Sequence, residues 1–174
     1  HSVAERGVHP ADVLAVTFTN KAAREMKERT VELLDHRARA MRIATFHSSC
    51  ARFLRENAGR LGISRSFSIY DSDDQLALVR EIARDLGLPY DAAAGKSYRH
   101  RVEAAKHRAL RVHEVHEEAR GSESEAFADL FEGYQAALRR QQAMDFGDLV
   151  AFLVHALEDD DTLRERLRSR FPMI

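Results

Sequence analysis

Two four-residue stretches, TFTN at residues 17–20 and TFHS at residues 45–48, each place a phenylalanine among small polar side chains. Both follow a short apolar run and precede a segment with helical periodicity, so each is predicted to form a corner between a strand and a helix. An aromatic ring at such a corner can stack on a nucleic-acid base, while hydroxyl, amide and backbone N–H groups hold phosphates. The alternative, that Phe18 and Phe46 pack beneath a sheet, is equally compatible with the residues.

Two other patterns suggest phosphate or metal chemistry but fit it less well. The AAAGKS stretch at residues 92–97 has Tyr90 where a phosphate loop needs its first glycine, and no apolar strand precedes it. His113 and His116 in HEVHE are three residues apart, whereas the zinc-protease motif places its histidines four residues apart. We therefore expect a loop that leads into a basic helix at the first stretch, and a solvated helix at the second.

The single cysteine of the chain, Cys50, lies three residues after His47, so the two could form a nucleophile and its base. On a helix, however, Cys50 shares a face with Phe46, Phe53 and Leu54. A cysteine on an apolar face usually belongs to the core. We therefore predict that Cys50 is a core residue and that His47 lies off this face.

Two short apolar runs, VLAVTF at residues 13–18 and MRIATF at residues 41–46, have the β-branched composition of buried strands. A helix-period segment follows each run, and Thr19 or Asn20 is predicted to cap the first of these helices. Strand–helix units with short connections are typical of an α/β fold with a parallel sheet. Ligands of such sheets bind at the carboxyl ends of the strands, where both corners are expected.

The remainder of the chain is predicted to be mostly helical. Ser72 and Gln75 fit an S-x-x-Q capping box for the first of these helices, and Asp145 is predicted to cap a strongly apolar one. The last residues, RFPMI, are typical of the start of another buried strand. The expected helices cover residues 72–86, 97–111, 112–120, 125–142, 146–157 and 161–169.

Composition and charge limit the classes of protein that the chain can belong to. It has 174 residues, 44% of them hydrophobic, and no apolar run approaches the length of a membrane span. One cysteine excludes an internal disulfide and a multi-cysteine zinc site, which fits a reducing, cytoplasmic setting. Residues 1–70 and 96–111 carry an excess of Lys and Arg, while residues 71–95 and 112–132 are acidic. The basic blocks are either polyanion-binding surfaces or ordinary solvated helix faces.

The stretch VTFTNKAAREMKER closely resembles the motif called Ia of superfamily 1 DNA helicases of the UvrD/Rep/PcrA type, and TFHSSCARFLR is similar to their motif Ib. Four further stretches, FSIYDSDDQLALVREI, AAKHRA, YQAALRRQQAMDFGDLV and LRERLRSRFPMI, follow in the family's order. In that family a helical subdomain, 1B, interrupts the first RecA-like domain, 1A. The resemblance implies a partial RecA-like parallel sheet, with residues 1–58 and 144–174 in 1A and residues 59–143 in 1B.

The resemblance also implies a function. The family moves 3′→5′ along single-stranded DNA using ATP and Mg²⁺, unwinds duplex DNA in repair or replication, and has cytoplasmic, nucleoid-associated members in bacteria. Its partners are single-stranded DNA and single-strand/duplex junctions, and not a membrane. The residues to which the resemblance assigns contact with the single strand are Phe18, Thr19, Asn20, Thr45, Phe46, His47 and Ser48. Subdomain 1B faces duplex DNA in the family, which points to phosphate contacts by Lys96, Arg99, Lys106, Arg108 and Arg111.

Three parts of the family's catalytic machinery have no counterpart in these residues: the phosphate loop, the acidic Mg²⁺-binding motif and the second RecA-like domain with its arginine. Phosphoryl transfer requires all three together. We therefore expect no catalytic, cofactor-binding or metal-binding residue here and no ATP hydrolysis by this chain alone. The partial sheet is also expected to present an unpaired edge that favours self-association. Two alternatives stay open: a non-catalytic nucleic-acid-binding module on the same scaffold, and an accessory region of a nuclease-linked recombination protein.

Overall fold

The computed structural model describes residues 8–174, except for the side chain of His36. It divides into two compact units, one formed by residues up to 53 together with residues 156–174, and the other by residues 54–155. The elements in chain order are η1 (Pro10–Asp12), β1 (Leu14–Thr17), α2 (Asn20–Leu34), η2 (Asp35–Ala40), β2 (Arg42–Thr45), α3 (Phe46–Glu56), α4 (Ala58–Leu61), β3 (Ser68–Tyr70), α5 (Ser72–Asp85), α6 (Ala92–His107), α7 (Val112–Glu118), α8 (Ser122–Arg140), β4 (Ala143–Asp145), α9 (Phe146–Asp159) and α10 (Asp161–Arg170).

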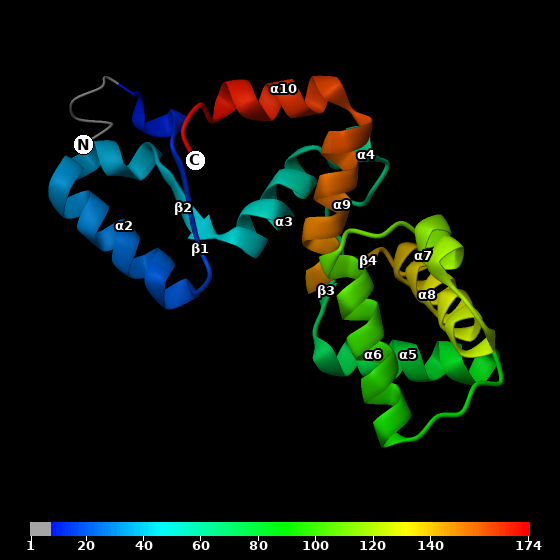
Figure 1. Ribbon diagram of the computed structural model, residues 1–174. Coiled ribbons are helices and arrows are strands. Elements are labelled where there is room, and N and C mark those ends of the chain that lie inside the picture. The colour runs from blue at the N-terminus through cyan, green and yellow to red at the C-terminus, as the bar shows by residue number, and fades with distance from the viewer. Residues whose placement is uncertain (1–7) are drawn as a thin grey trace. The chain divides into compact units, whose positions relative to one another are not determined.

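The first unit is built on the two predicted strands, and the prediction of a parallel α/β arrangement is confirmed. Strands β1 and β2 pair in parallel, with Thr17 opposite Thr45 at their carboxyl ends. Helix α2 packs against β2, and the two ends of the described chain lie close to β1 (Figure 1). Met173 forms a parallel bridge with Val13, and the backbone N–H of Leu14 donates to the Met173 carbonyl at 3.0 Å. The expected strand at the end of the chain is thus present as a single bridge beside β1.

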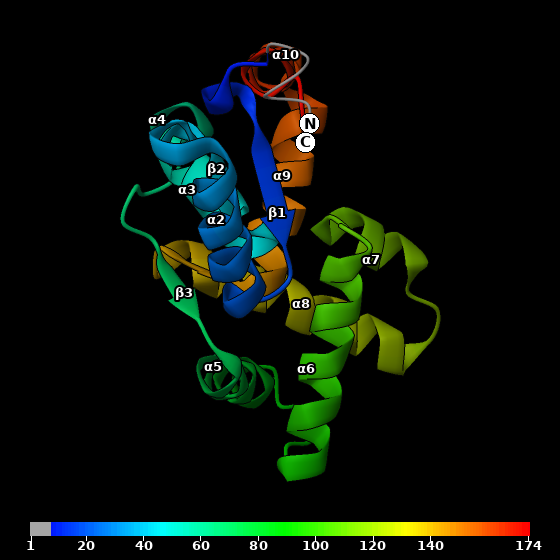
Figure 2. The ribbon, with the colours of Figure 1, turned by 90° about the vertical axis from the view of Figure 1, so that its left-hand side faces the viewer.

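The second unit contains the main core of the protein. Helix α5 packs against both α6 and α8, and α7 packs against α8 (Figures 1 and 2). The predicted apolar stripe of α8 supplies the largest buried side chains, which confirms that part of the prediction. Its members are Phe127, Leu130, Phe131, Tyr134 and Leu138.

A second, two-stranded parallel sheet lies in this unit, formed by β3 and β4. The sequence predicts an extended piece at β3 but gives no sign of β4, whose three residues stand between the helices expected at 125–142 and 146–157 and show no period of their own. Tyr70 at the end of β3 pairs with Asp145 at the end of β4. The unpredicted strand therefore fixes where α9 begins.

The cap of α5 differs from the predicted one by one residue. Asp71, not Ser72, is the N-cap: its side chain accepts the N–H groups of Asp73 and Asp74 at 2.9 and 3.0 Å. Asp74 completes the capping box by accepting the Asp71 N–H at 3.2 Å. An aspartate caps a helix as well as a serine does, and its charge also interacts favourably with the helix dipole. The capping box is therefore formed by Asp71 and Asp74, one residue before the predicted pair, Ser72 and Gln75.

This difference predicts unequal effects of two neighbouring substitutions. Asp71→Ala removes the cap and is expected to lower the free energy of unfolding by about 0.5–2 kcal/mol. Ser72→Ala is expected to change it by less than about 0.5 kcal/mol, because Ser72 is exposed in the first turn. Urea denaturation followed by circular dichroism measures both. A larger effect for Ser72→Ala than for Asp71→Ala would indicate that Ser72 is the N-cap, as the sequence pattern predicts.

Candidate nucleic-acid interface

The corner between β1 and α2 presents its aromatic residue to solvent. Phe18 follows the last residue of β1 and is 92% exposed, so the alternative in which it packs beneath the sheet is wrong. Thr19 caps α2, its hydroxyl accepting the N–H of Ala22 at 3.1 Å. Asn20 is the exposed first residue of the helix. A free ring therefore stands beside the amino end of a 15-residue helix, whose unpaired N–H groups favour anions.

Hydrogen bonds between Thr45 and Ser48 stabilise the corner between β2 and α3. Thr45 is buried; its hydroxyl donates to Ser48 Oγ at 2.7 Å and accepts the Ser48 N–H at 3.2 Å. Phe46 is 42% exposed, and His47 meets its ring edge-on with the centroids 6.2 Å apart. Thr45 is thus placed to shape the corner, while Phe46, His47 and Ser48 are the groups that a ligand can reach.

The strand register brings these two corners together. Thr17 and Thr45 are paired partners in neighbouring parallel strands, and Phe18 and Phe46 are the next residue in each case. Neighbouring strands lie about 4.8 Å apart, and both corners occupy the same edge of the sheet. The two phenylalanines therefore form adjacent exposed aromatic positions at the carboxyl ends of the strands.

A third strand ends in the same way in the second unit. Phe146 directly follows Asp145, the last residue of β4, and is 50% exposed. Sequence periodicity assigns Phe146 to the apolar face of the following helix and so misses it. The available signal is the repeated pattern of a strand end followed by phenylalanine, as in TF, TF and DF, but it could be recognised only once β4 was known.

The five basic residues expected at phosphates occupy different environments. Lys96 is exposed on α6. Arg99 pairs with Glu103 at 2.6 Å, and Arg108 forms a two-point pair with Glu118 at 2.8 and 2.5 Å. The Glu118 carboxylate raises the pKa of the Arg108 guanidinium, and Arg108 in turn lowers the pKa of Glu118. These arginines would have to exchange a carboxylate partner for a phosphate.

Arg111 stands at the start of α7, where its backbone N–H donates to Glu114 at 2.7 Å. Its side chain is half-buried. Four of the five basic residues thus lie on α6 or in the segment that follows it, namely Lys96, Arg99, Arg108 and Arg111. They do not form one cluster of positive charge, because Arg99 and Arg108 are each paired with a glutamate.

Lys106 requires a correction. Its side chain is 1% exposed, and its ammonium group lies 2.6 Å from Asp145 Oδ2 and 2.8 Å from Asp148 Oδ1. A charge of this kind is retained in a protein interior because it is paired. Lys106 is therefore unavailable to a DNA phosphate and is removed from the contact residues. Sequence spacing could not reveal this, because its partners lie about 40 residues further along the chain.

The structure shows where the AAAGKS stretch, Cys50 and the HEVHE stretch lie. Residues 92–97, AAAGKS, form the first turns of α6 rather than a loop, with Asp91 as the cap. Cys50 is a buried core residue as predicted, and burial raises the pKa of its thiol, which disfavours the nucleophilic thiolate. His116 pairs with Glu132 at 3.0 Å. Within residues 8–174 no group of His, Cys, Asp and Glu has the arrangement of a metal site.

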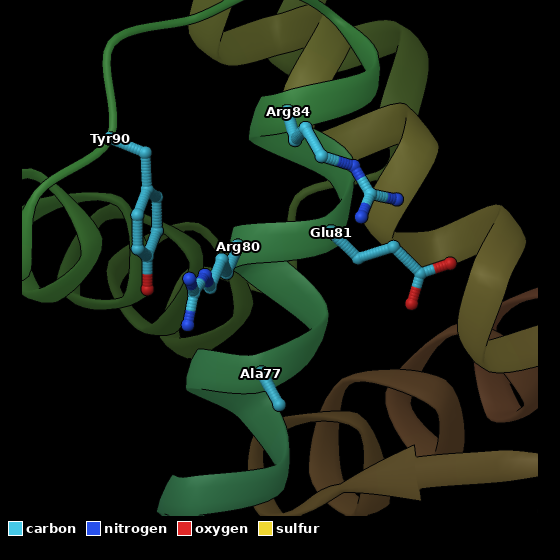
Figure 3. A pocket seen from close by; sticks show the side chains of 5 residues that line it. All are labelled: Ala77, Arg80, Glu81, Arg84 and Tyr90. Atoms are coloured by element: carbon cyan, nitrogen blue, oxygen red, sulfur yellow. The ribbon is translucent and has the colours of Figure 1, made fainter.

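A pocket of about 460 Å³ lies on α5, lined by Ala77, Arg80, Glu81, Arg84 and Tyr90. Figure 3 shows Arg80 turned toward Tyr90, which comes from the segment after α5, and Glu81 pointing away from both. The Arg80 guanidinium lies 6.0 Å from the centre of the Tyr90 ring. Arg84 is paired with Asp85 at 3.0 Å. The lining carries charges of both signs, and we assign no ligand to it.

The described fold and corners define a class: a parallel α/β protein with exposed aromatic residues at its strand ends, joined to a helical unit. Comparison with known proteins gives the family. The family model of the UvrD/REP helicase N-terminal domain matches residues 1–174. The chain belongs to this family.

Among its relatives, the ATP-dependent DNA helicase PcrA of Staphylococcus aureus is 34% identical over 170 residues, which are 98% of this chain and 23% of that protein. The ATP-dependent DNA helicase UvrD1 of Mycobacterium bovis is 37% identical over 173 residues, 97% of this chain and 22% of that protein. The chain thus spans less than a quarter of each relative. Among the described residues, no helix is both long and apolar enough to cross a membrane.

Proposed function

We propose that this chain is the part of an ATP-dependent DNA helicase that binds single-stranded DNA, and that the helicase moves 3′→5′ in DNA repair or replication. The single observation that carries the proposal is the adjacent pair of exposed rings, Phe18 and Phe46, which follow the paired residues Thr17 and Thr45. Rings at this spacing offer stacking faces to bases, and the amino ends of α2 and α3 offer N–H groups to phosphates. The helicase names of the relatives support this function over a non-catalytic binding module.

The proposed partners are single-stranded DNA and single-strand/duplex junctions. The proposed contacts in the first unit are Phe18, Thr19, Asn20, Phe46, His47 and Ser48, with Thr45 holding the second corner. In the second unit Phe146 is added as a third aromatic contact because it repeats the exposed strand-end position. Lys96, Arg99, Arg108 and Arg111 are retained as phosphate contacts.

The domain assignment by resemblance is also part of the proposal. Residues 1–58 and 144–174 are assigned to RecA-like domain 1A, and residues 59–143 to subdomain 1B. It is supported by the compact unit that combines both ends of the chain. The whole protein is proposed to use ATP and Mg²⁺ and to act in the cytoplasm at the nucleoid, while the unpaired sheet edge favours self-association of this chain.

The salt dependence of binding tests the proposed function. A fluorescein-labelled oligo(dT) is titrated with the 174-residue chain at several salt concentrations. Each phosphate contact is expected to add about −0.7 to the slope of log K against log salt concentration. A slope near zero, or equal affinity for blunt duplex DNA of the same length, would contradict single-strand binding through phosphate contacts and stacking on unpaired bases.

ATP hydrolysis is expected to be undetectable for this chain alone, with or without oligo(dT). The physical reason is that phosphoryl transfer needs a phosphate cradle, a metal carboxylate and an arginine in one site, and the AAAGKS stretch is helical. A phosphate-release assay measures it. DNA-stimulated phosphate release by the purified chain that persists through a second purification step would disprove this expectation.

A further inference from the structure

The corner between β4 and α9, which carries Phe146, is held by bonds on both sides of that residue. Asp145 Oδ1 accepts the N–H of Asp148 at 2.9 Å, and Asp148 Oδ2 accepts the N–H of Asp145 at 3.2 Å. This is a reciprocal cap of the kind that fixes the entry into a helix. The backbone of Phe146 and Gly147 is thus enclosed between two mutually bonded aspartates.

Lys106 reaches this corner from α6 through both its charge and its stem. A Cβ atom placed on Gly147 would lie 2.9 Å from Cβ and 3.0 Å from Cδ of Lys106, so the glycine permits the lysine stem to pack on the first turn of α9. Beyond the stem, the ammonium group lies within 2.8 Å of oxygens from both capping aspartates. The lysine therefore contacts each residue that fixes the backbone around Phe146.

The two carboxylate oxygens that contact Lys106 also accept hydrogen bonds from α8. The Tyr134 hydroxyl donates to Asp145 Oδ2 at 2.9 Å, and Gln135 Nε2 donates to Asp148 Oδ1 at 3.1 Å. Burial and the Asp145 carboxylate raise the pKa of Tyr134, so its hydroxyl keeps the proton that it donates. Helices α6, α8 and α9 thus meet at two aspartates that share one buried ammonium group.

We infer that Lys106 is a positioning residue that, through Asp145 and Asp148, holds Phe146 in the orientation in which it meets the DNA strand. This inference rests on the proposed function for its DNA half, and on the bonds of the buried corner for its positioning half. Stacking on a base requires a defined orientation of the ring. The conformation of the backbone that carries the half-exposed ring is one determinant of that orientation. The network defines the backbone from which the ring projects.

A purely structural role for Lys106 makes a different prediction. If the lysine only adds stability to the unit, its removal weakens all buried amides of that unit alike. If it positions the corner, the amides of residues 145–149 open before those of α8. Amide hydrogen exchange separates these cases, because local and global openings exchange at different rates.

The experiment compares two Lys106 variants of the full 174-residue chain with Phe146→Ala, alone and combined with Lys106→Met, by hydrogen exchange and by oligo(dT) titration. Lys106→Met keeps most of the stem and removes the charge. Lys106→Met/Asp148→Asn removes one charge of each sign, so the net charge of the buried cluster is unchanged, and it serves if the single variant does not fold. Lys27→Met, on the exposed surface of α2, is the matched control for loss of one lysine.

We expect exchange at the residue-148 N–H to rise at least about tenfold more in the Lys106 variants than exchange at the core amides of α8, which rises only as far as the global loss of stability requires. The affinity for oligo(dT) should fall, by less than the loss caused by Phe146→Ala, and adding Lys106→Met to Phe146→Ala should cause little further loss. Unchanged corner exchange, or a uniform rise across the unit, would overturn the positioning role.

Failure of the proposed function gives a different result. In that case the parent chain itself binds oligo(dT) without the expected salt dependence, whatever the exchange data show. A Phe146→Ala variant that binds as tightly as a salt-dependent parent chain removes only Phe146 from the interface. Increased corner exchange with no loss of affinity in either variant would overturn the link between Lys106 and DNA binding while leaving its contact with the corner intact.

Discussion

Replacement of Lys106 by methionine is expected to lower the free energy of unfolding of the second unit by about 3–5 kcal/mol. The Lys106 side chain is 1% exposed, and its ammonium group is paired with two buried carboxylates, those of Asp145 and Asp148. Without it these carboxylates repel each other in a site that water does not reach. Burial already raises the pKa of Asp148, against the opposing effect of the Lys106 charge. Urea denaturation followed by circular dichroism at 222 nm measures the loss.

A compensated variant shows that the loss comes from unpaired charge and not from lost packing. Lys106→Met/Asp145→Asn/Asp148→Asn has no buried charge at the corner, and the asparagine side chains can still accept the capping N–H groups. Most of the lost stability is expected to return, because removing a whole buried ion cluster is often close to neutral. Lys27→Met, at an exposed position, should change stability by less than about 0.5 kcal/mol. A loss below about 1 kcal/mol for Lys106→Met would show that the aspartates find another partner.

Replacement of Phe18 by alanine is expected to weaken binding of oligo(dT) by about 1–3 kcal/mol, or about 5- to 150-fold, if the ring stacks on a base. The ring is 92% exposed, so it contributes little to the core, and the free energy of unfolding should stay within about 0.5 kcal/mol of the parent value. The same titration that yields the salt slope measures the affinity.

Leu33→Ala is the matched control for Phe18→Ala. Leu33 is also a large, exposed apolar residue, 82% exposed, but it lies in the last turn of α2, at the other end of the helix that follows Phe18. Its loss should leave affinity for the oligonucleotide unchanged. Equal losses for the two variants would indicate non-specific apolar binding, and an unchanged affinity for Phe18→Ala would remove this ring from the interface.

The two strand–helix units and the parallel pairing of β1 with β2 could be predicted from the sequence, whereas β4 and the start of α6 could not. Short apolar runs rich in β-branched residues and followed by helical periodicity are strong local signals, and they identified both corners. The apolar stripe of α8 and the burial of Cys50 were predictable for the same reason, since a helical face that is apolar throughout has to be covered. The cap of α5 was misplaced by one residue, because serine and aspartate are equally good caps and adjacent candidates compete.

What the sequence by itself determined is therefore local: where strands end, which residues follow them, and which helical faces are apolar. Only the tertiary structure decided which charged residues reach solvent. Lys106 and Lys96 belong to one basic segment, yet one is exposed, and the other is buried against aspartates 39 and 42 positions away. Likewise, the exposure of Phe18 and Phe146 depended on what the rest of the fold left uncovered. Periodicity reports the immediate neighbours of a residue, whereas burial and ion pairing depend on contacts between segments distant in the chain.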